Sequence, residues 1–372
     1  MSYEFLQILW FILIAVLWAG YLVLEGFDFG VGMLLHWLPK NTRERRLMLN
    51  TIGPHWDGNE VWLLTAGGAT FAAFPAWYAT MFSGFYLALF VILVVLILRI
   101  VAIEWRGKIS NPAWGARWDW IHTVSAWIAT FLWGVAFANL VQGMNVIVVE
   151  RGTWTQIPAD QVASMTGAEA AHYMPGGFSG FFSLLTPFTI LGGLVTVGLF
   201  LTHGAIFIAL KTAGDLQRRA TEAAKKFSIV SLVVAAVWAI WAQLGHGGHW
   251  LGWVGLVGAA VALVGVVLAT QAEREGWAFI ANAVAAVFAV VLIFSTMYPY
   301  VMKSSVDEAY SLTIAAASSS EQTLPVMTLV ALTLVPVVLV YMAWTYWIFR
   351  RRLTVDLVPE QNAGLAREVS AH

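Results

Sequence analysis

Residues 53–62 read Gly53-Pro54-His55-Trp56-Asp57-Gly58-Asn59-Glu60-Val61-Trp62, and they open a long apolar stretch. Asp57 and Glu60 are three residues apart, so on a helix their carboxylates share one face. Ionisable groups inside a membrane helix are energetically costly and usually serve a function. The stretch therefore predicts a membrane helix with functional polar groups in its first turns.

The composition around this stretch is that of a membrane protein. The chain has 372 residues, of which 60% are hydrophobic and 11% are charged, whereas soluble domains have about 25% charged residues. It contains no cysteine, which excludes disulfides, cysteine-bound zinc and iron–sulfur clusters on this chain. No basic tract points to a nucleic-acid partner. We therefore expect an all-α polytopic membrane protein without a metal site.

Hydropathy divides the chain into about nine transmembrane helices, each with the roughly 20 apolar residues that a span requires. Pro187 and the pair Gly192-Gly193 predict a kink or break in the fifth span. We expect the first span to be a retained helix, since no signal cleavage site follows it. The expected spans are 8–30, 52–74, 79–103, 120–148, 179–210, 227–245, 251–270, 277–299 and 325–349.

The basic residues predict how the bundle is oriented. If the N-terminus lies outside, the outer connections carry only two basic residues, Arg151 and Lys303, and all the other connections with Lys and Arg lie inside. An excess of Lys and Arg in the connections of one side marks that side as cytoplasmic. We therefore expect a cytoplasmic C-terminus, a single transmembrane domain over residues 1–352 and a polar cytoplasmic tail over residues 353–372. The inner connections carry Lys40, Arg43, Arg45, Arg46, Arg106, Lys108, Arg117, Lys211, Arg218, Arg219, Lys225, Lys226 and Arg274, and the tail begins with Arg350, Arg351 and Arg352.

Ionisable residues gather toward the inner leaflet on consecutive helices. Such groups can hold and release protons at depths where a bare charge is costly, and a nearby arginine keeps a carboxylate ionised. We therefore expect a proton pathway that opens to the cytoplasm. Its candidate residues are Glu25, Asp28, Asp57, Glu60, Arg99 and Glu104.

Three of these carboxylates also fit structural roles. Asp28 could cap a helix break between Gly26 and Gly30, and Asp57 could bind the free amide groups of a helix N-terminus. Glu104 lies near the inner interface, where a solvated or ion-paired residue is common. The sequence alone leaves both interpretations open.

Three histidines within or near spans, His55, His122 and His203, are in principle haem-ligand candidates. A lone histidine is more often a hydrogen-bonded structural residue, and we expect that role for each. His246 and His249 share a short outer loop that offers no further ligands, so no metal site is expected there.

The polar stretches match a known family, in order along nearly the whole chain. The chain resembles subunit II of cytochrome bd-type quinol oxidases. The matching stretches are Glu25-Gly26-Phe27-Asp28-Phe29-Gly30-Val31-Gly32, Pro54-His55-Trp56-Asp57-Gly58-Asn59-Glu60-Val61-Trp62, Thr65-Ala66-Gly67-Gly68-Ala69, Phe82-Ser83-Gly84-Phe85-Tyr86, Trp118-Asp119-Trp120, Gly134-Val135-Ala136-Phe137, Asn139-Leu140, Gln142-Gly143 and residues 318–324, with Pro336, Tyr341, Trp344, Tyr346 and Trp347.

The resemblance implies a respiratory complex of a prokaryotic cytoplasmic membrane that oxidises quinol and reduces dioxygen to water. It implies two four-helix bundles and a peripheral C-terminal helix. Two haems b and one haem d are expected on the partner, subunit I, and no haem or catalytic residue on this chain. The partners that it implies are subunit I, in a heterodimer, and membrane lipids, with a small third subunit left open. In some members a quinone or lipid occupies a structural site on subunit II.

The resemblance also assigns roles to the candidate residues. Asp57 is the central relay, with Glu25 and Asp28 on the adjacent helix and Arg99 and Glu104 on the third. Glu60, the remaining candidate, is a glutamine in some members. The alternative from another class is a proton-coupled secondary transporter, which also holds carboxylates beside broken helices. A purified complex with a second, haem-bearing chain would favour the oxidase.

Overall fold

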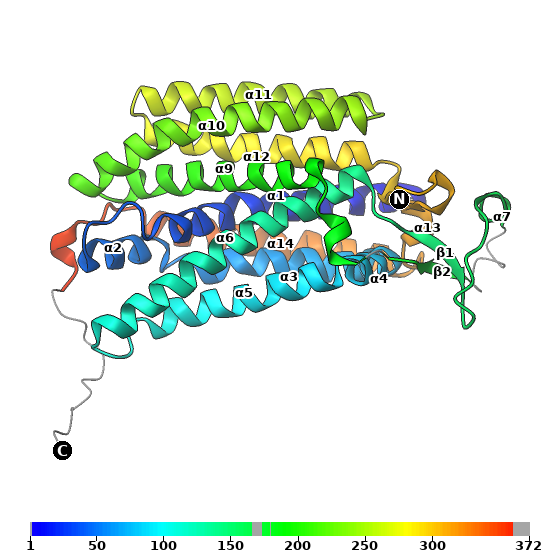
Figure 1. Ribbon diagram of the computed structural model, residues 1–372, viewed down its shortest axis with the longest axis horizontal. Coiled ribbons are helices and arrows are strands. Elements are labelled where there is room, and N and C mark those ends of the chain that lie inside the picture. The colour runs from blue at the N-terminus through cyan, green and yellow to red at the C-terminus, as the bar shows by residue number, and fades with distance from the viewer. Residues whose placement is uncertain (1, 166–172, 179, 360–372) are drawn as a thin grey trace, which may run out of the picture.

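The computed structural model describes residues 2–165, 173–178 and 180–359. Its long helices run side by side along the longest axis of the molecule (Figure 1). The helices are α1 (Tyr3–Leu34), α2 (Thr42–Ile52), α3 (Trp56–Ala73), α4 (Pro75–Gly84), α5 (Tyr86–Trp105), α6 (Pro112–Gln142), α7 (Ala159–Ser164), α9 (Pro187–Lys211), α10 (Asp215–Gly245), α11 (Trp250–Gln271), α12 (Glu275–Met297), α13 (Ile314–Ala317) and α14 (Thr323–Ile348). The short elements are β1 (Ile147–Glu150), β2 (Tyr173–Gly176), η1 (Phe181–Leu184), β3 (Tyr300–Met302), η2 (Glu308–Tyr310), β4 (Leu312–Thr313) and η3 (Val355–Leu357).

The long helices form two groups that meet along α1, α6 and α9. In the first group α1 packs against α3 and α6, and α5 packs against α6; in the second, α9, α10, α11 and α12 pack in sequence. Helix α14 lies at the periphery, where it contacts α1 and α3. Its buried residues are Leu324 and Thr328, both near its start. The peripheral position of α14 agrees with the resemblance, and the division into two four-helix bundles stays a prediction.

Eight helices of the described residues are long and apolar enough to cross a membrane, which confirms an all-α polytopic fold. They correspond to eight of the expected spans. The remaining expected span, 52–74, corresponds to α3, an 18-residue helix with polar first turns. Because Phe74 precedes a proline, it leaves the helical conformation, with φ −135° and ψ 68°, and α3 ends there. The count of nine crossings stays a prediction.

Two details of the expected spans are wrong. The span 79–103 is not continuous, because α4 ends at Gly84 and α5 begins at Tyr86. The kink or break predicted in the fifth span takes the form of a break, and the expected start at residue 179 is wrong, because Pro187 is the first residue of α9, where its missing N–H costs nothing. Thr186 precedes it and closes a capping box with Thr189, so the helix begins here and not at residue 179.

Glycines allow α1 and α9 to cross closely, and this crossing fixes the inner half of α1. A Cβ atom built on Gly30 would lie 2.7 Å from the Cα of Gly204, and one built on Gly26 would lie 2.7 Å from the Phe200 ring. Only glycine tolerates so close an approach of two backbones. The crossing lies immediately beside Asp28 and so orients the candidate site.

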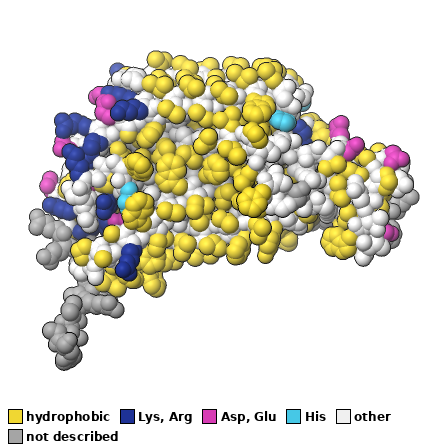
Figure 2. All heavy atoms as spheres, in the orientation of Figure 1, with side chains coloured by type: hydrophobic (Ala, Val, Ile, Leu, Met, Phe, Trp, Pro, Cys, Tyr) yellow, Lys and Arg dark blue, Asp and Glu magenta, His cyan; other side chains and the backbone are white. Residues whose placement is uncertain are grey.

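The two ends of the bundle differ in charge. The N-terminus and the described C-terminal segment lie at opposite ends (Figure 1), as an odd number of crossings requires. Figure 2 shows Lys and Arg side chains gathered at the end that holds α2, while hydrophobic side chains cover the middle of the molecule. The opposite end carries two small antiparallel sheets, β1 with β2 and β3 with β4.

The basic end contains two features that the sequence did not predict. The first is α2, which lies in the expected loop 31–51 and is capped by Asn41. The second is the start of the expected tail, where the Leu353 amide donates to the Lys211 carbonyl at 2.7 Å. Arg43 donates to the carbonyls of Val355 and Val358 at 3.1 and 2.9 Å. The division at 352/353 stays a prediction, and residues 360–372 of the expected tail lie outside the described residues.

Candidate functional site

A buried ion pair joins the first and third expected spans. Glu25 on α1 and Arg99 on α5 form a salt bridge in which both side chains are 0% exposed. The guanidinium of Arg99 also lies over the Phe29 ring, 4.6 Å from its centroid. Two charges with so little access to water are stable only as partners, so this pair ties α1 to α5.

Asp28 is the second buried carboxylate, and a chain of hydrogen bonds leads from it to the last helix. Asn59 Nδ2 donates to Asp28 Oδ2 at 2.7 Å and to the Leu24 carbonyl at 3.1 Å. The Tyr346 hydroxyl donates to Asn59 Oδ1 at 2.7 Å. The other oxygen of Asp28 has no hydrogen-bond partner among the described residues. Three helices, α1, α3 and α14, therefore meet at this carboxylate.

The charges of this cluster do not balance as they stand. Arg99 interacts electrostatically with Glu25, Asp28 and Glu60, and it is paired directly with Glu25. One guanidinium neutralises one carboxylate, and a second unpaired carboxylate in an apolar interior is very costly. The cluster therefore holds more carboxylates than its single buried arginine can neutralise.

The remaining candidate residues lie progressively closer to the surface. Glu60 is half-buried and Asp57, three residues earlier on α3, is exposed. Glu104 is exposed near the end of α5, and it forms no salt bridge within the part of the chain that the structure describes. The structure thus brings together Glu25, Asp28 and Arg99, with Glu60 and Asp57 leading outward and Glu104 apart.

Asn59 and Tyr346 belong to the cluster but were not among the residues predicted for it. Asn59 lies between Asp57 and Glu60 in the stretch 53–62. A polar amide in the first turns of a membrane helix could have indicated that it belongs to the cluster. Tyr346 is 287 residues away from Asn59 along the chain, and no pattern in the sequence indicates that pairing.

Aromatic side chains close the cluster on the side away from the basic end. Tyr21, one helical turn from Glu25, packs edge-on against Trp18 and Trp133, with ring centroids 5.9 and 5.8 Å apart. Beyond this layer lies an apolar groove of about 530 Å³, lined by residues of α1, α3, α4, α5 and α6 that include Trp18, Trp133 and Phe90. The aromatic layer thus lies between the polar cluster and this groove.

Two of the three interior histidines are packed against aromatic rings. His55 stacks on the Tyr346 ring at 4.2 Å with the planes 4° apart. His203 stacks on Phe279 at 4.5 Å, and its Nε2 lies 3.1 Å from the Val23 carbonyl. His122 lies so close to Gly32 that a Cβ there would be 2.7 Å from Nε2. Among the described residues no three His, Cys, Asp or Glu side chains form a metal cluster.

Fold and site together define a multi-pass membrane protein whose helices enclose an acidic cluster around one arginine, near the basic end of the bundle. Comparison with known proteins makes the class specific. The sequence matches the family described as cytochrome bd terminal oxidase subunit II over residues 6–349, and the chain belongs to that family. It is therefore a multi-pass protein of a prokaryotic cytoplasmic membrane.

The relatives span almost the whole chain. The sequence is 40% identical to cytochrome bd ubiquinol oxidase subunit 2 of Bacillus subtilis, over 93% of this chain and 96% of that protein. It is 36% identical to cytochrome bd-I ubiquinol oxidase subunit 2 of Escherichia coli, over 98% and 99%. A chain of the bd oxidase structure from Geobacillus thermodenitrificans shares the fold, with a TM-score of 0.61, 16% identity and coverage of 92% and 95%.

Proposed function

We propose that this chain conducts protons from the basic end of the bundle to the dioxygen-reducing centre of its partner, and braces that partner in the membrane. The chain is a subunit of a quinol oxidase complex; its relatives in Bacillus subtilis and Escherichia coli are ubiquinol oxidase subunits by name. Family membership favours this function over the proton-coupled transporter. The observation that carries the proton pathway is the buried Glu25–Arg99 pair with Asp28 beside it.

The order of the groups from surface to interior suits a proton pathway. Asp57 is exposed, Glu60 is half-buried, and Glu25 and Asp28 are fully buried. Asp57 and Glu60 are one turn apart on α3, and Glu60 is within electrostatic reach of Arg99. A proton taken up by Asp57 can therefore move inward through groups of increasing burial.

Arg99 sets the proton occupancy of the buried end. Its single positive charge compensates Glu25, so Asp28 is the carboxylate that is neutral at rest and carries the proton. When Asp28 releases that proton toward the partner, the cluster gains a negative charge in an apolar setting, and this favours uptake of the next proton from Glu60. The aromatic layer of Trp18, Tyr21 and Trp133 limits water beyond the cluster.

The redox chemistry belongs to the partner. Haem-bearing subunit I would supply electron transfer from quinol and the reduction of dioxygen, as in the family that the chain belongs to; His55 and His203 of this chain are packed against aromatic rings. The apolar groove of about 530 Å³ has the size and lining for a quinone ring or a lipid chain held as a structural element. A small third subunit remains a prediction from the resemblance.

The pathway is tested by Asp57→Asn in the complex with the partner subunit. We expect oxygen consumption with quinol to fall at least about tenfold, about 1.4 kcal/mol in the barrier, while the haem absorbance spectrum is unchanged. Asp57→Glu should retain most of the activity, because the proton-carrying group is kept.

The matched control is Asp215→Asn, which removes another exposed carboxylate of the basic end. It should leave turnover unchanged. Normal turnover in Asp57→Asn would remove Asp57 from the pathway. Glu104→Gln decides the role of Glu104, and a loss of turnover with normal haem spectra would add it to the path despite its distance from the cluster.

A further inference from the structure

The amide group of Asn59 links the buried carboxyl group of Asp28 to helix α14. Asn59 is fully buried, and its Nδ2 donates to the Leu24 carbonyl at 3.1 Å and to Asp28 Oδ2 at 2.7 Å. Its Oδ1 accepts a hydrogen bond from the Tyr346 hydroxyl at 2.7 Å. An amide has one donor end and one acceptor end, so these three bonds keep the donor end toward Asp28.

The three bonds form together in one orientation of the amide. If the group were turned over, Asn59 Oδ1 would face the Leu24 carbonyl, and two acceptors form no hydrogen bond. The Tyr346 hydroxyl adds to this preference, because it satisfies the buried Oδ1. Without that hydroxyl Oδ1 is a buried acceptor without a donor, which is costly and offsets part of the preference for the observed orientation.

Two other rings hold the Tyr346 ring in place. His55, which is buried, stacks on it with the centroids 4.2 Å apart and the planes 4° apart. Phe27 lies edge-on to it, with the centroids 6.5 Å apart. These contacts direct the hydroxyl at Asn59. A phenylalanine at this position would keep the ring contacts and lose the hydroxyl alone.

The donor end of Asn59 decides which oxygen of Asp28 can carry a proton. A proton on Asp28 Oδ2 would face the N–H group of Asn59, donor against donor. Asp28 Oδ1 has no hydrogen-bond partner among the described residues, and a neutral carboxyl group at such a position costs less than a charged one. The proton of Asp28 therefore belongs on Oδ1.

We propose that Asn59 and Tyr346 are positioning residues that confine proton exchange at Asp28 to Oδ1. The inference rests on the proposed function, in which Asp28 carries the proton. In the observed orientation Asn59 offers this proton no acceptor, so the proton leaves without breaking a hydrogen bond to the amide. In the turned orientation the protonated Asp28 would donate to Asn59 Oδ1, and that bond would have to break in every turnover.

Infrared spectroscopy of the purified complex with the partner subunit tests this arrangement. The C=O stretching band of protonated Asp28 is identified by its loss in Asp28→Asn. In Asn59→Leu the band should move to higher wavenumber, because the carbonyl oxygen Oδ2 loses its donor. In Tyr346→Phe a second band should appear from the turned amide, and turnover should fall about fivefold, the equivalent of one net hydrogen bond.

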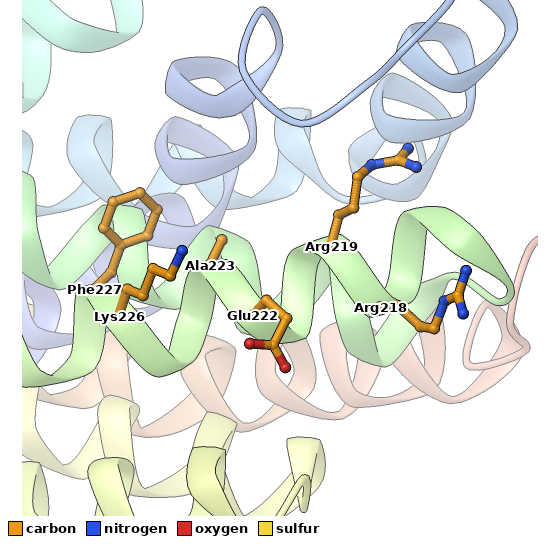
Figure 3. Close-up of a pocket in the computed structure, with 6 residues that line it drawn as sticks. All are labelled: Arg218, Arg219, Glu222, Ala223, Lys226 and Phe227. Atoms are coloured by element: carbon orange, nitrogen blue, oxygen red, sulfur yellow. The ribbon is translucent and has the colours of Figure 1, made fainter.

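Three control variants accompany these. Glu222→Gln also removes a carboxyl group, but one that is 61% exposed and paired with Lys225, in the groove over the first turns of α10 (Figure 3); the Asp28 band should remain. Tyr341→Phe removes the hydroxyl of a tyrosine of α14 that is 62% exposed, and it should change neither the band nor turnover. Thr328→Val removes the acceptor of Trp10 Nε1, 3.0 Å away, and should lower the thermal midpoint without moving the band.

The inference is overturned if Tyr346→Phe leaves the band or turnover unchanged. It is also overturned if Thr328→Val alters the band as much, because Tyr346 would then only fasten α14 to the bundle. A complex without any band from Asp28 would overturn the proton-carrying role of Asp28 as well. The band reports on Asp28 whatever the turnover, so failure of the pathway at Asp57 leaves this test decisive. If Asp28→Asn does not assemble, the shift in Asn59→Leu identifies the band.

Discussion

Removing Arg99 should show how far the fold depends on one buried charge. Arg99→Gln leaves Glu25 without its partner in a site where both side chains are 0% exposed. Breaking a buried ion pair from one side costs about 3–5 kcal/mol, because the remaining charge is neither solvated nor compensated. With Asp28 also buried, we expect a loss at the upper end of that range, and a cluster that takes up an additional proton.

The double variant separates pairing from packing. In Glu25→Gln with Arg99→Gln both charges are gone, so most of the lost stability should return, and the coupling energy should reach at least about 2 kcal/mol. The free energy of unfolding is measured by titrating the purified complex with dodecyl sulfate and following tryptophan fluorescence. Asp215→Asn, which breaks an exposed pair with Arg218, should cost no more than about 0.5 kcal/mol.

A different result would refute the charge argument. If the losses of the two single variants simply add in the double variant, Glu25 and Arg99 do not stabilise each other. If Arg99→Gln is no more destabilising than Asp215→Asn, the interior around Glu25 is wet, and the balance of charges that makes Asp28 the proton carrier does not apply.

Two further predictions concern the surroundings of the site. Gly30→Ala should destabilise the complex by about 1–3 kcal/mol through overpacking, since its Cβ would press on Gly204. The control is Gly276→Ala, whose Cβ would have nothing within 4 Å. Equal thermal midpoints of the two variants would contradict the close crossing of α1 and α9. Burial and then the Lys303 charge lower the pKa of His246 from its usual 6.5. The unfolded chain therefore binds this proton first as the pH falls below about 6.5, so stability should fall there, and His246→Gln should remove that part of the pH dependence of the thermal midpoint.

Much of the fold could be predicted from hydropathy, because a membrane span is a property of about 20 consecutive residues. The ends of each helix, however, depend on single residues, and an average of hydropathy over about 20 residues does not resolve them. Phe85 alone separates α4 from α5, as the C-cap of one helix and the N-cap of the other, and Pro187 starts a helix inside the span where a kink or break was expected. Helix α2 was not predicted because it is short and polar, and hydropathy does not distinguish such a helix from a charged loop.

The site could be predicted only in part. Glu25, Asp28 and Arg99 were recognisable because each is an ionisable group in an apolar helix, and the structure brings the three together. Glu104 carries the same signal, yet it is exposed, because five residues beyond Arg99 the helix has reached its end. The hydrogen bond from Tyr346 to Asn59 depends on how α14 packs, which no local pattern records.

That hydrogen bond has a consequence for biosynthesis. Asp28 lies on α1, whereas Tyr346, which completes its contacts through Asn59, lies far along the chain on α14. Translation must therefore reach α14 before the contacts of Asp28 are complete. Until then Asp28 lies in the bilayer without its full set of hydrogen bonds. In this interval a translocon or a membrane-embedded chaperone would shield the carboxylate from lipid.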